Sequence, residues 1–142
     1  MLSSKLSVGV HILTLLAQPP GEPLTSEHIA GSVNTNPVVI RRLLGLLREA
    51  GYVESRGGVG GGWLMIEDPA RIRLLDVLHA VEPDRETFAL PRNQPNPACL
   101  VGRHIQGVLT DVYADVRKGM EEQLARTTVA DILASVEGRA ID

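Results

Sequence analysis

The residues most suited to chemistry lie in one short stretch, where an arginine is followed by a run of glycines. Residues 54–63 read Glu-Ser-Arg-Gly-Gly-Val-Gly-Gly-Gly-Trp, and two further arginines, Arg41 and Arg42, precede them. Glycine has no Cβ, so a glycine-rich backbone can approach another molecule closely. Arginine presents a planar fork of donors that suits phosphates and guanine edges. Nucleic acid is therefore the first partner to consider.

The same glycine run could instead cradle the phosphate of a nucleotide, but its spacing fits neither common motif. A phosphate-binding loop ends in Gly-Lys followed by Ser or Thr, and no such sequence occurs here. The dinucleotide motif needs a third glycine where Trp63 stands. Both nucleotide motifs therefore fail.

The single cysteine, Cys99, excludes an intrachain disulfide and a zinc site built from cysteines of this chain. Two interpretations of Cys99 stay open. It is either a small, partly buried apolar residue that caps a long helix, or a redox switch that reacts as a thiolate near a helix N-terminus with Arg103 assisting. Oxidation, or a disulfide between subunits, would then change the spacing of two DNA-binding helices.

The histidines and the remaining polar residues indicate neither a metal site nor an enzyme. No pair among His11, His28, His79 and His104 has the i, i+4 spacing of helical metal ligands. Cys99 and His104 are five residues apart, so on one helix they would point about 140° from each other. With no other catalytic motif present, we predict that the chain is not an enzyme and binds no metal.

Charge is distributed unevenly along the 142 residues, whose formal net charge is −3. Residues 1–63 carry five Lys or Arg against four Asp or Glu, and the remainder carries nine against thirteen. A sequence-specific DNA reader needs only a local basic face. No apolar run reaches the roughly 18 residues of a membrane span, and no signal peptide is evident. We expect a cytoplasmic location and no membrane partner.

The N-terminal half reads as helices followed by a hairpin. A buried helix over 6–17 is followed by helices over 26–33 and from 37 to Ala50, capped by Thr25 and Asn36 and separated by a polar turn. Residues 52–55 and 63–66 read as two strands around the glycine loop. The helix from 37 has a core face formed by Ile40, Leu43, Leu44 and Leu47. Its solvent-facing stripe is Val38, Arg41, Arg42 and Gly45.

The C-terminal half reads as a short helix over 74–81, a Pro-rich loop, and a helix that starts near Cys99 and continues for nearly thirty residues. A stripe with three–four spacing marks its expected dimer interface: Ile105, Val108, Leu109, Val112, Tyr113, Val116 and Met120. Such a helix would be about 40 Å long, so we expect a second subunit to cover the stripe. The alternative is that the helix folds back on its own domain. Thr128 and Asp131 resemble a capping box for a short last helix over 129–136.

Several segments resemble the Rrf2 family of bacterial winged-helix transcription regulators, over nearly the whole chain. The matching segments are Leu24–Ala30, Asn36–Leu44, Leu47–Val53, Ser55–Trp63 and Arg73–Glu82. The wing is the most specific match, with Trp63 where the family usually has Tyr or Phe. Family members that hold an iron–sulfur cluster use three cysteines, and this chain has one. Residues 96–103 instead resemble the cluster-free, single-cysteine, YwnA-like branch, so we expect no cofactor.

The resemblance implies a mainly α fold with a small two-stranded β-wing: a winged helix-turn-helix domain over residues 1–82, a Pro-rich loop over 83–98, and a dimerisation helix with a short terminal helix over 99–142. It implies a homodimeric DNA-binding transcriptional regulator, expected to be a repressor, on a pseudo-palindromic operator of double-stranded DNA. The signal would be an oxidant or a small molecule. The expected DNA contacts are Ser3, Lys5, Thr25, Ser26, Asn36, Pro37, Val38, Arg41, Arg42, Arg56, Gly57, Gly58 and Gly60.

A different class of function stays open beside this one. The chain could be a dimerising adaptor that keeps the winged helix for protein contacts and does not bind DNA. The salt dependence of a mobility shift on upstream DNA would separate the two.

Overall fold

The computed structural model describes residues 3–84 and 86–141, which form two compact units. The first unit joins Met1–Pro83 to Leu124–Asp142, and the second is Asp84–Gln123. This division differs from the predicted one, which placed the last helix with the long helix in residues 99–142. The last helix belongs to the first unit because it packs against the first helix and the 3₁₀ helix of that unit.

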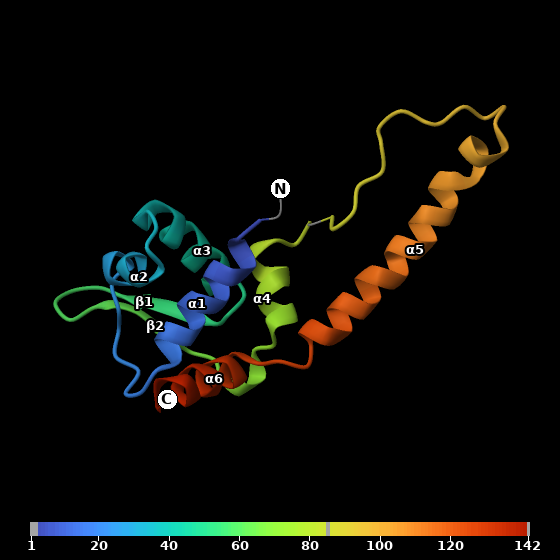
Figure 1. Cartoon of the computed structure of the whole chain (residues 1–142). Helices are drawn as coiled ribbons and strands as arrows, with labels where there is room; N and C mark the ends of the chain where they lie inside the picture. The colour runs from blue at the N-terminus through green and yellow to red at the C-terminus, as the bar shows by residue number, and fades with distance from the viewer. Residues whose placement is uncertain (1–2, 85, 142) are drawn as a thin grey trace. The chain divides into compact units, whose positions relative to one another are not determined.

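The first unit contains the helices and the hairpin of a winged helix (Figure 1). Its elements are α1 (Lys5–Ala17), α2 (Ser26–Val33), α3 (Pro37–Glu49), β1 (Val53–Arg56), β2 (Gly62–Met65), the 3₁₀ helix η1 (Pro69–Arg71), α4 (Leu74–Val81) and α6 (Val129–Ile141). The predicted bounds of α2 and α4 are confirmed, and α1 begins one residue earlier than expected. Each strand is displaced by one residue from its predicted position.

Helix α1 is the centre of the first unit, as its apolar composition predicts. It contacts α2, α3, α4, α6 and β2. Ile12 and Leu13 are fully buried, and Leu16 nearly so. Gly9 lets α4 approach closely, since a Cβ at this position would lie 3.0 Å from Cγ1 of Val77. Burial of aliphatic side chains around one helix holds the winged helix together.

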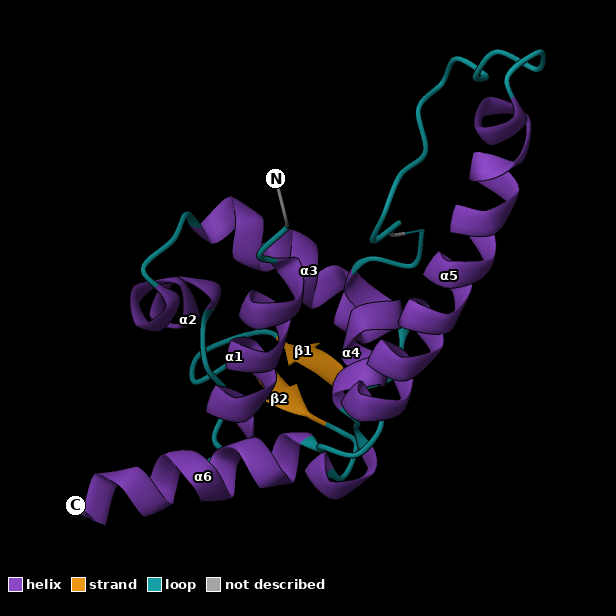
Figure 2. Cartoon of the chain, turned by 45° about the vertical axis from the view of Figure 1, so that its right-hand side comes forward, coloured by secondary structure: helices purple, strands orange, loops and turns teal. Residues whose placement is uncertain are grey.

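The hairpin of β1 and β2 is antiparallel, with Val53 opposite Met65 and Arg56 opposite Gly62 (Figure 2). A third segment joins it, because Leu24 exchanges two backbone hydrogen bonds with Trp63, at 2.9 and 2.7 Å. Leu24 comes just before α2. The wing is therefore tied to the start of the helix-turn-helix by backbone pairing.

Helix α4 begins at a compact charged cap. The backbone N–H of Arg73 donates to Oδ2 of Asp76 at 2.9 Å, and the Arg73 side chain donates to both carboxylate oxygens, at 3.1 and 2.7 Å. The guanidinium of Arg73, through these hydrogen bonds, holds the pKa of Asp76 below its ordinary value, although partial burial acts in the opposite direction. The cap satisfies a backbone donor that the first turn of a helix leaves unpaired.

Helix α6 is anchored to the first unit at its N-terminus. The backbone N–H of Leu74 donates to the carbonyl of Thr127 at 2.9 Å, and that of Val129 donates to the carbonyl of Ile72 at 2.8 Å. The predicted capping box is confirmed, since Thr128 and Asp131 exchange hydrogen bonds of 2.9 and 3.1 Å. The helix continues to Ile141, past the predicted end at 136, because no helix-breaking proline follows.

The second unit consists of an irregular proline-containing segment and most of α5 (Leu100–Leu124). Helix α5 has 25 residues, which corresponds to about 37 Å. The ring of Phe88 in the irregular segment stacks on Tyr113 of α5, with centroids 5.1 Å apart. No residue of α5 is buried, so this helix has an apolar stripe without a core of its own.

Candidate nucleic-acid interface

Helix α3 has the two faces that its sequence predicts. Its core face is buried, formed by Ile40, Leu43, Leu44 and Leu47. On the other side Val38 is 56% exposed, and Arg41 and Arg42 are also exposed. An exposed helix face with paired guanidinium groups has the donors needed to reach base edges or phosphates.

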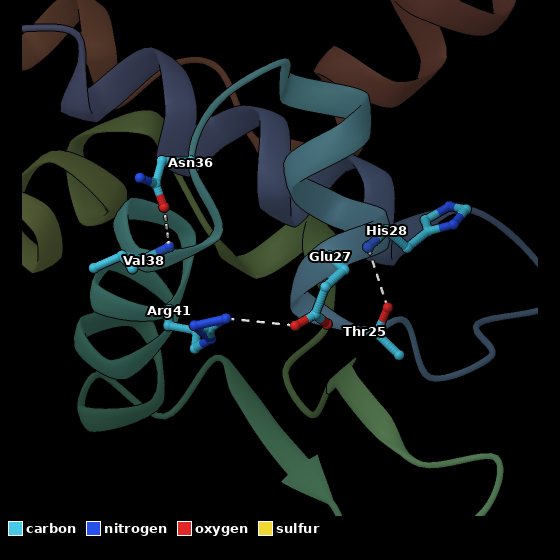
Figure 3. A network of polar contacts seen from close by, with 6 residues as sticks. All are labelled: Thr25, Glu27, His28, Asn36, Val38 and Arg41. Carbon is cyan, nitrogen blue, oxygen red and sulfur yellow. Dashed lines mark hydrogen bonds and ion pairs between the residues drawn. The ribbon is translucent and has the colours of Figure 1, made fainter.

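Both helices of the helix-turn-helix are fixed by polar side chains at their N-termini (Figure 3). Oγ1 of Thr25 accepts a hydrogen bond from the backbone N–H of His28 at 3.1 Å, and Oδ1 of Asn36 accepts one from that of Val38 at 2.8 Å. Pro37 occupies the first position of α3, where its missing N–H costs no hydrogen bond. Gly51 follows α3 with a φ of 86°, a left-handed conformation that commonly ends a helix.

The same observations bear on the residues predicted to touch the DNA backbone. Thr25 and Asn36 are exposed but already use their side-chain oxygens as caps. Ser26 is only 8% exposed, so little of its surface is available for the expected contact with DNA. Ser26 is covered because α2 packs against α1 and α3. Ser3 and Lys5 are exposed, and the Ser3 hydroxyl accepts a hydrogen bond from the backbone N–H of Lys5 at 3.1 Å.

Arg41 lies beside an acidic side chain of the preceding helix. Its Nη2 is 3.4 Å from Oε1 of Glu27 in the first turn of α2 (Figure 3). Within the described part of the chain, no carboxylate lies within ion-pair distance of Arg42. The two neighbouring arginines therefore differ in their surroundings, a distinction that their adjacent positions in the sequence do not reveal.

The wing carries Arg56 at the end of β1 and a tip formed by the glycine run. Gly58 and Gly60 have φ values of 82° and 77°, in the left-handed region that only glycine adopts readily. Val59 between them is fully exposed. Arg56 pairs with Glu54, with Nη2 3.4 Å from Oε1. Glu54 and Arg56 point to one side of the strand because alternate residues of a strand share a face.

Trp63 of β2 joins the wing to the hydrophobic core of the first unit. Its half-buried side chain packs against the hydrophobic core. The guanidinium carbon of Arg48, in the last turn of α3, lies 5.4 Å from the centre of the Trp63 ring. This cation–π contact links the end of α3 to β2.

The predicted dimer interface lies on α5, in the second unit. Val108, Val112 and Val116, spaced four apart, are 56%, 47% and 43% exposed. The remaining predicted members are partly covered: Ile105, Leu109, Tyr113 and Met120. The ring of Phe88, in the same unit, stacks on Tyr113 and covers part of it. An aliphatic ridge along one side of a helix is a surface that another helix can cover.

Cys99 lies directly before α5, as the sequence predicts. The interpretation of a partly buried residue is wrong for the single chain, because Cys99 is exposed. Its backbone N–H donates to the carbonyl of Asn96 at 3.2 Å, and its carbonyl accepts from the N–H of Arg103 at 2.9 Å. This turn places the cysteine on the surface at the start of the helix.

Metal-binding side chains do not gather in the described residues, where no group of three or more His, Cys, Asp or Glu could hold an ion. His11 instead hydrogen-bonds through Nε2 to the hydroxyl of Ser32 at 3.0 Å. That pair borders a cavity of about 460 Å³ in the first unit, lined also by Ile132 and Leu133 of α6. Its volume is within the range of small-molecule sites.

Across residues 3–84 and 86–141, every helix is too short or too polar to span a bilayer.

Comparison with known proteins identifies the family to which this geometry belongs. Residues 2–135 match the model of the Rrf2 family, described as an iron-dependent transcriptional regulator. The chain belongs to the Rrf2 family. It is 45% identical to YwnA of Bacillus subtilis (strain 168), over 94% of this chain and 97% of YwnA.

Two further relatives agree with this assignment. The HTH-type transcriptional regulator CymR of B. subtilis is 26% identical to this Rrf2 protein, over 96% of this chain and 92% of CymR. The solved structure of T. potens IscR superposes with a TM-score of 0.74 and 26% identity, over 98% of this chain and 90% of IscR. The chain is thus a DNA-binding transcriptional regulator, and the family favours this function over the adaptor without DNA binding. That the relatives are regulators is also consistent with a protein that is not an enzyme.

Sequence reasoning missed the acidic partners of the arginines. The spacing of Glu54 and Arg56 on one strand is a local signal that could have identified their pairing. The pairing of Glu27 with Arg41 depends on how α2 crosses α3, so no local pattern reveals it.

Proposed function

We propose that this Rrf2 regulator represses transcription as a cytoplasmic homodimer that binds a pseudo-palindromic operator. One observation carries the proposal: α3 exposes two adjacent arginines, and the glycine-tipped wing follows it in the same unit. A helix-turn-helix dimer places its second helices in major grooves about one turn of DNA apart. Two copies of the α3 face would then read the two half-sites.

The residue roles follow from side-chain chemistry and exposure. Val38, Arg41 and Arg42 are the candidates for base edges or phosphates, because all three are exposed on α3. Arg56 is the candidate for the minor groove or its phosphates, and the glycines beside it leave room for close approach. Thr25, Asn36, Ser3 and Lys5 stay as candidate contacts to the backbone, through their peptide groups where the side chains serve as caps.

The homodimer would form through the aliphatic ridge of α5. In support, α5 buries none of its residues in the single chain, and three of its valines are more than two-fifths exposed. A surface of this kind is stable in water when a second copy covers it. Sedimentation equilibrium would give the mass of two chains if the proposal holds, and of one chain if it does not.

The DNA contact can be tested by titrating a mapped operator with Arg42→Ala. We expect a loss of about 1–3 kcal/mol if Arg42 reads a base, together with relaxed preference at that base pair. Arg139→Ala, which removes the same charge from exposed α6, is the matched control and should bind as the wild type does. Unchanged operator binding by Arg42→Ala would show that Arg42 does not contribute to the interface with DNA.

Cys99 is the proposed receiver of an oxidant signal. Peroxide would oxidise the thiolate to a sulfenic acid and be reduced to water, and condensation with the partner subunit's Cys99 thiol would form a disulfide with loss of water. The exposed position of the thiol supports this role. Peroxide should weaken operator binding by the wild type and leave Cys99→Ser unaffected. If Cys99→Ser loses binding equally, the cysteine does not receive the signal.

A small molecule is the other proposed signal, and the cavity beside His11 and Ser32 could admit one. An iron–sulfur cluster does not fit this chain, although the family description includes iron. A cluster typically needs four protein ligands, and each chain contributes one cysteine. We therefore propose regulation without a cluster. After anaerobic incubation with iron and sulfide, the protein should show no cluster absorption in the visible range.

A further inference from the structure

Two of the three arginines proposed to contact DNA are paired with glutamates of their own unit. Arg41 of α3 pairs with Glu27 of α2, and Arg56 of β1 pairs with Glu54 of the same strand, both at 3.4 Å. The third arginine, Arg42, has no such partner within the described residues. The acidic side chains thus lie at the surface that has to approach a polyanion.

The two ion pairs are exposed and contribute little to folding. The side chains of Arg41 and Glu27 are 50% and 69% exposed, and those of Arg56 and Glu54 are 62% and 43% exposed. Solvent-exposed pairs add little to stability because water screens them. Their separation also exceeds the roughly 2.7–2.9 Å of a strong charge-assisted hydrogen bond. Each arginine can therefore leave its glutamate for a better acceptor.

We propose that Glu27 and Glu54 are specificity-determining residues of the DNA-binding face. In the free protein each glutamate forms an ion pair with an arginine. Its negative charge also repels the phosphates of any DNA that approaches. A phosphate of random DNA must compete with the carboxylate and overcome this repulsion. At the operator, a bidentate contact with a guanine edge in the major groove draws Arg41 away from Glu27. A narrow minor groove, with its enhanced negative potential, draws Arg56 away from Glu54. The inference rests on the proposed DNA face.

The small net charge of the N-terminal 63 residues agrees with this role of the two glutamates. Residues 1–63 have only one more basic than acidic residue. Non-specific affinity comes almost entirely from phosphate neutralisation, so two carboxylates beside the arginines lower it most effectively. Contact with a base edge is affected less, because the guanine edge is neutral. The two glutamates therefore increase the ratio of the affinity for the operator to the affinity for random DNA.

The test uses the full-length chain with Glu27→Gln, Glu54→Gln and both together. One duplex carries the site mapped by footprinting on the gene's own upstream region, and the other has the same length and composition with that site scrambled. Binding to both is titrated at several salt concentrations. Glu137→Gln on α6 makes the same change in charge away from any arginine contact in the described residues, and it is the matched control.

We expect each variant to bind the scrambled duplex about threefold to tenfold more tightly than the wild type. Operator binding should improve less, so the specificity ratio falls. The salt dependence of binding to the scrambled duplex should steepen by about one unit for each arginine that is freed. The control should change neither quantity. Thermal unfolding of the variants should match the wild type, because these are surface pairs.

Two results would overturn the inference. One is an unchanged specificity ratio in the double variant. The other is weaker operator binding with unchanged binding to the scrambled duplex, which would mean that Glu27 orients Arg41 on the operator instead of competing for it. Failure of the wild-type chain to bind the operator is a distinguishable result, because it contradicts the proposed function and removes the basis of this inference.

Discussion

Helices α1 and α5 are both rich in aliphatic residues but use them differently. Helix α1 has 13 residues, of which five are buried by elements of its own unit. Helix α5 has 25 residues and buries none of them. In α1 the apolar residues surround most of the helix, whereas in α5 they form one ridge with charged residues elsewhere.

The difference shows what each helix needs in order to be stable. Helix α1 is stabilised within one chain, because the aliphatic side chains of α1 and α4 are packed against each other. Helix α5 leaves an aliphatic ridge in water, which is unfavourable until a partner covers it. Apolar content alone does not distinguish the two cases, but the width of the apolar surface does.

The largest effect should follow from a cavity in the core around α1. Leu13→Ala should lower the free energy of unfolding by about 2–5 kcal/mol, because Leu13 is fully buried and its neighbours can only partly collapse into the space. Urea unfolding followed by circular dichroism measures the change. Val59→Ala at the exposed wing tip is the control, with an expected effect within about 0.5 kcal/mol. Equal effects of the two substitutions would contradict the packing described for α1.

A charge on the ridge of α5 should affect assembly more than folding. Val112→Glu should weaken the dimer by about 2–4 kcal/mol, because the carboxylate would have to be buried between two subunits. Sedimentation equilibrium over a range of concentrations measures the shift. Ala114→Glu adds the same charge about 160° away around the helix and should leave the dimer intact. If both variants dimerise like the wild type, α5 does not form the interface.

One matched pair of substitutions compares the two helices directly. In α1, a Cβ at Gly9 would lie 3.0 and 3.3 Å from methyl groups of Val77 and Val81, which are themselves buried. The overpacking cost of about 1–3 kcal/mol exceeds the gain of about 0.5–1 kcal/mol in helix propensity, so Gly9→Ala should lower the free energy of unfolding by about 1 kcal/mol. In α5 nothing lies within 4 Å of the position, so Gly107→Ala should raise helix stability by about 0.5–1 kcal/mol. Thermal unfolding of both variants should shift in opposite directions.

The smallest effect concerns the charged cap of α4, at the surface of the same unit that holds α1. The pKa of Asp76 is lowered in the folded chain, mainly by its hydrogen bonds from Arg73. Its stabilising contribution is therefore present above the ordinary carboxyl pKa of 3.8 and is lost as the pH falls through the lower folded value. Asp76→Asn should cost about 0.5–1 kcal/mol at pH 7, since the cap is partly exposed.

The pH dependence of that cost provides the check on Asp76. Urea unfolding of Asp76→Asn and the wild type should differ at neutral pH and converge in strong acid, where the wild-type carboxylate is protonated. Asp68→Asn alters a cap that has no arginine contact among the described residues, and it controls for the general loss of negative charge. A difference that persists unchanged into acid would show that the charge of Asp76 does not matter.

The elements that the sequence predicts well are those specified by neighbouring residues. Thr25 and Asn36 cap α2 and α3 through hydrogen bonds to residues two or three positions away, so their spacing is visible in the sequence. The core face of α3 follows from helical periodicity alone. The two exposed arginines were predicted for the same reason, because a face opposite four buried aliphatic residues has to lie in solvent.

The features that were missed depend on contacts between distant residues. Helix α6 belongs to the first unit because Val129 bonds to Ile72, more than fifty positions earlier, and no periodicity encodes that pairing. The burial of Ser26 and the pairing of Glu27 with Arg41 depend on the packing of α2 against its neighbours. The exposure of Cys99 depends on a turn that begins at Asn96.

The central claim is that the exposed face of α3 binds DNA in a dimer, and footprinting tests it most directly. The gene's own upstream region would be footprinted with the wild type and with the double substitution Arg41→Ala and Arg42→Ala. We expect the wild type to protect two half-sites whose centres lie one or two turns of the double helix apart, and the double variant, still folded and dimeric, to protect neither. Protection by the double variant that matches the wild type, or a single unpaired half-site, would contradict the account.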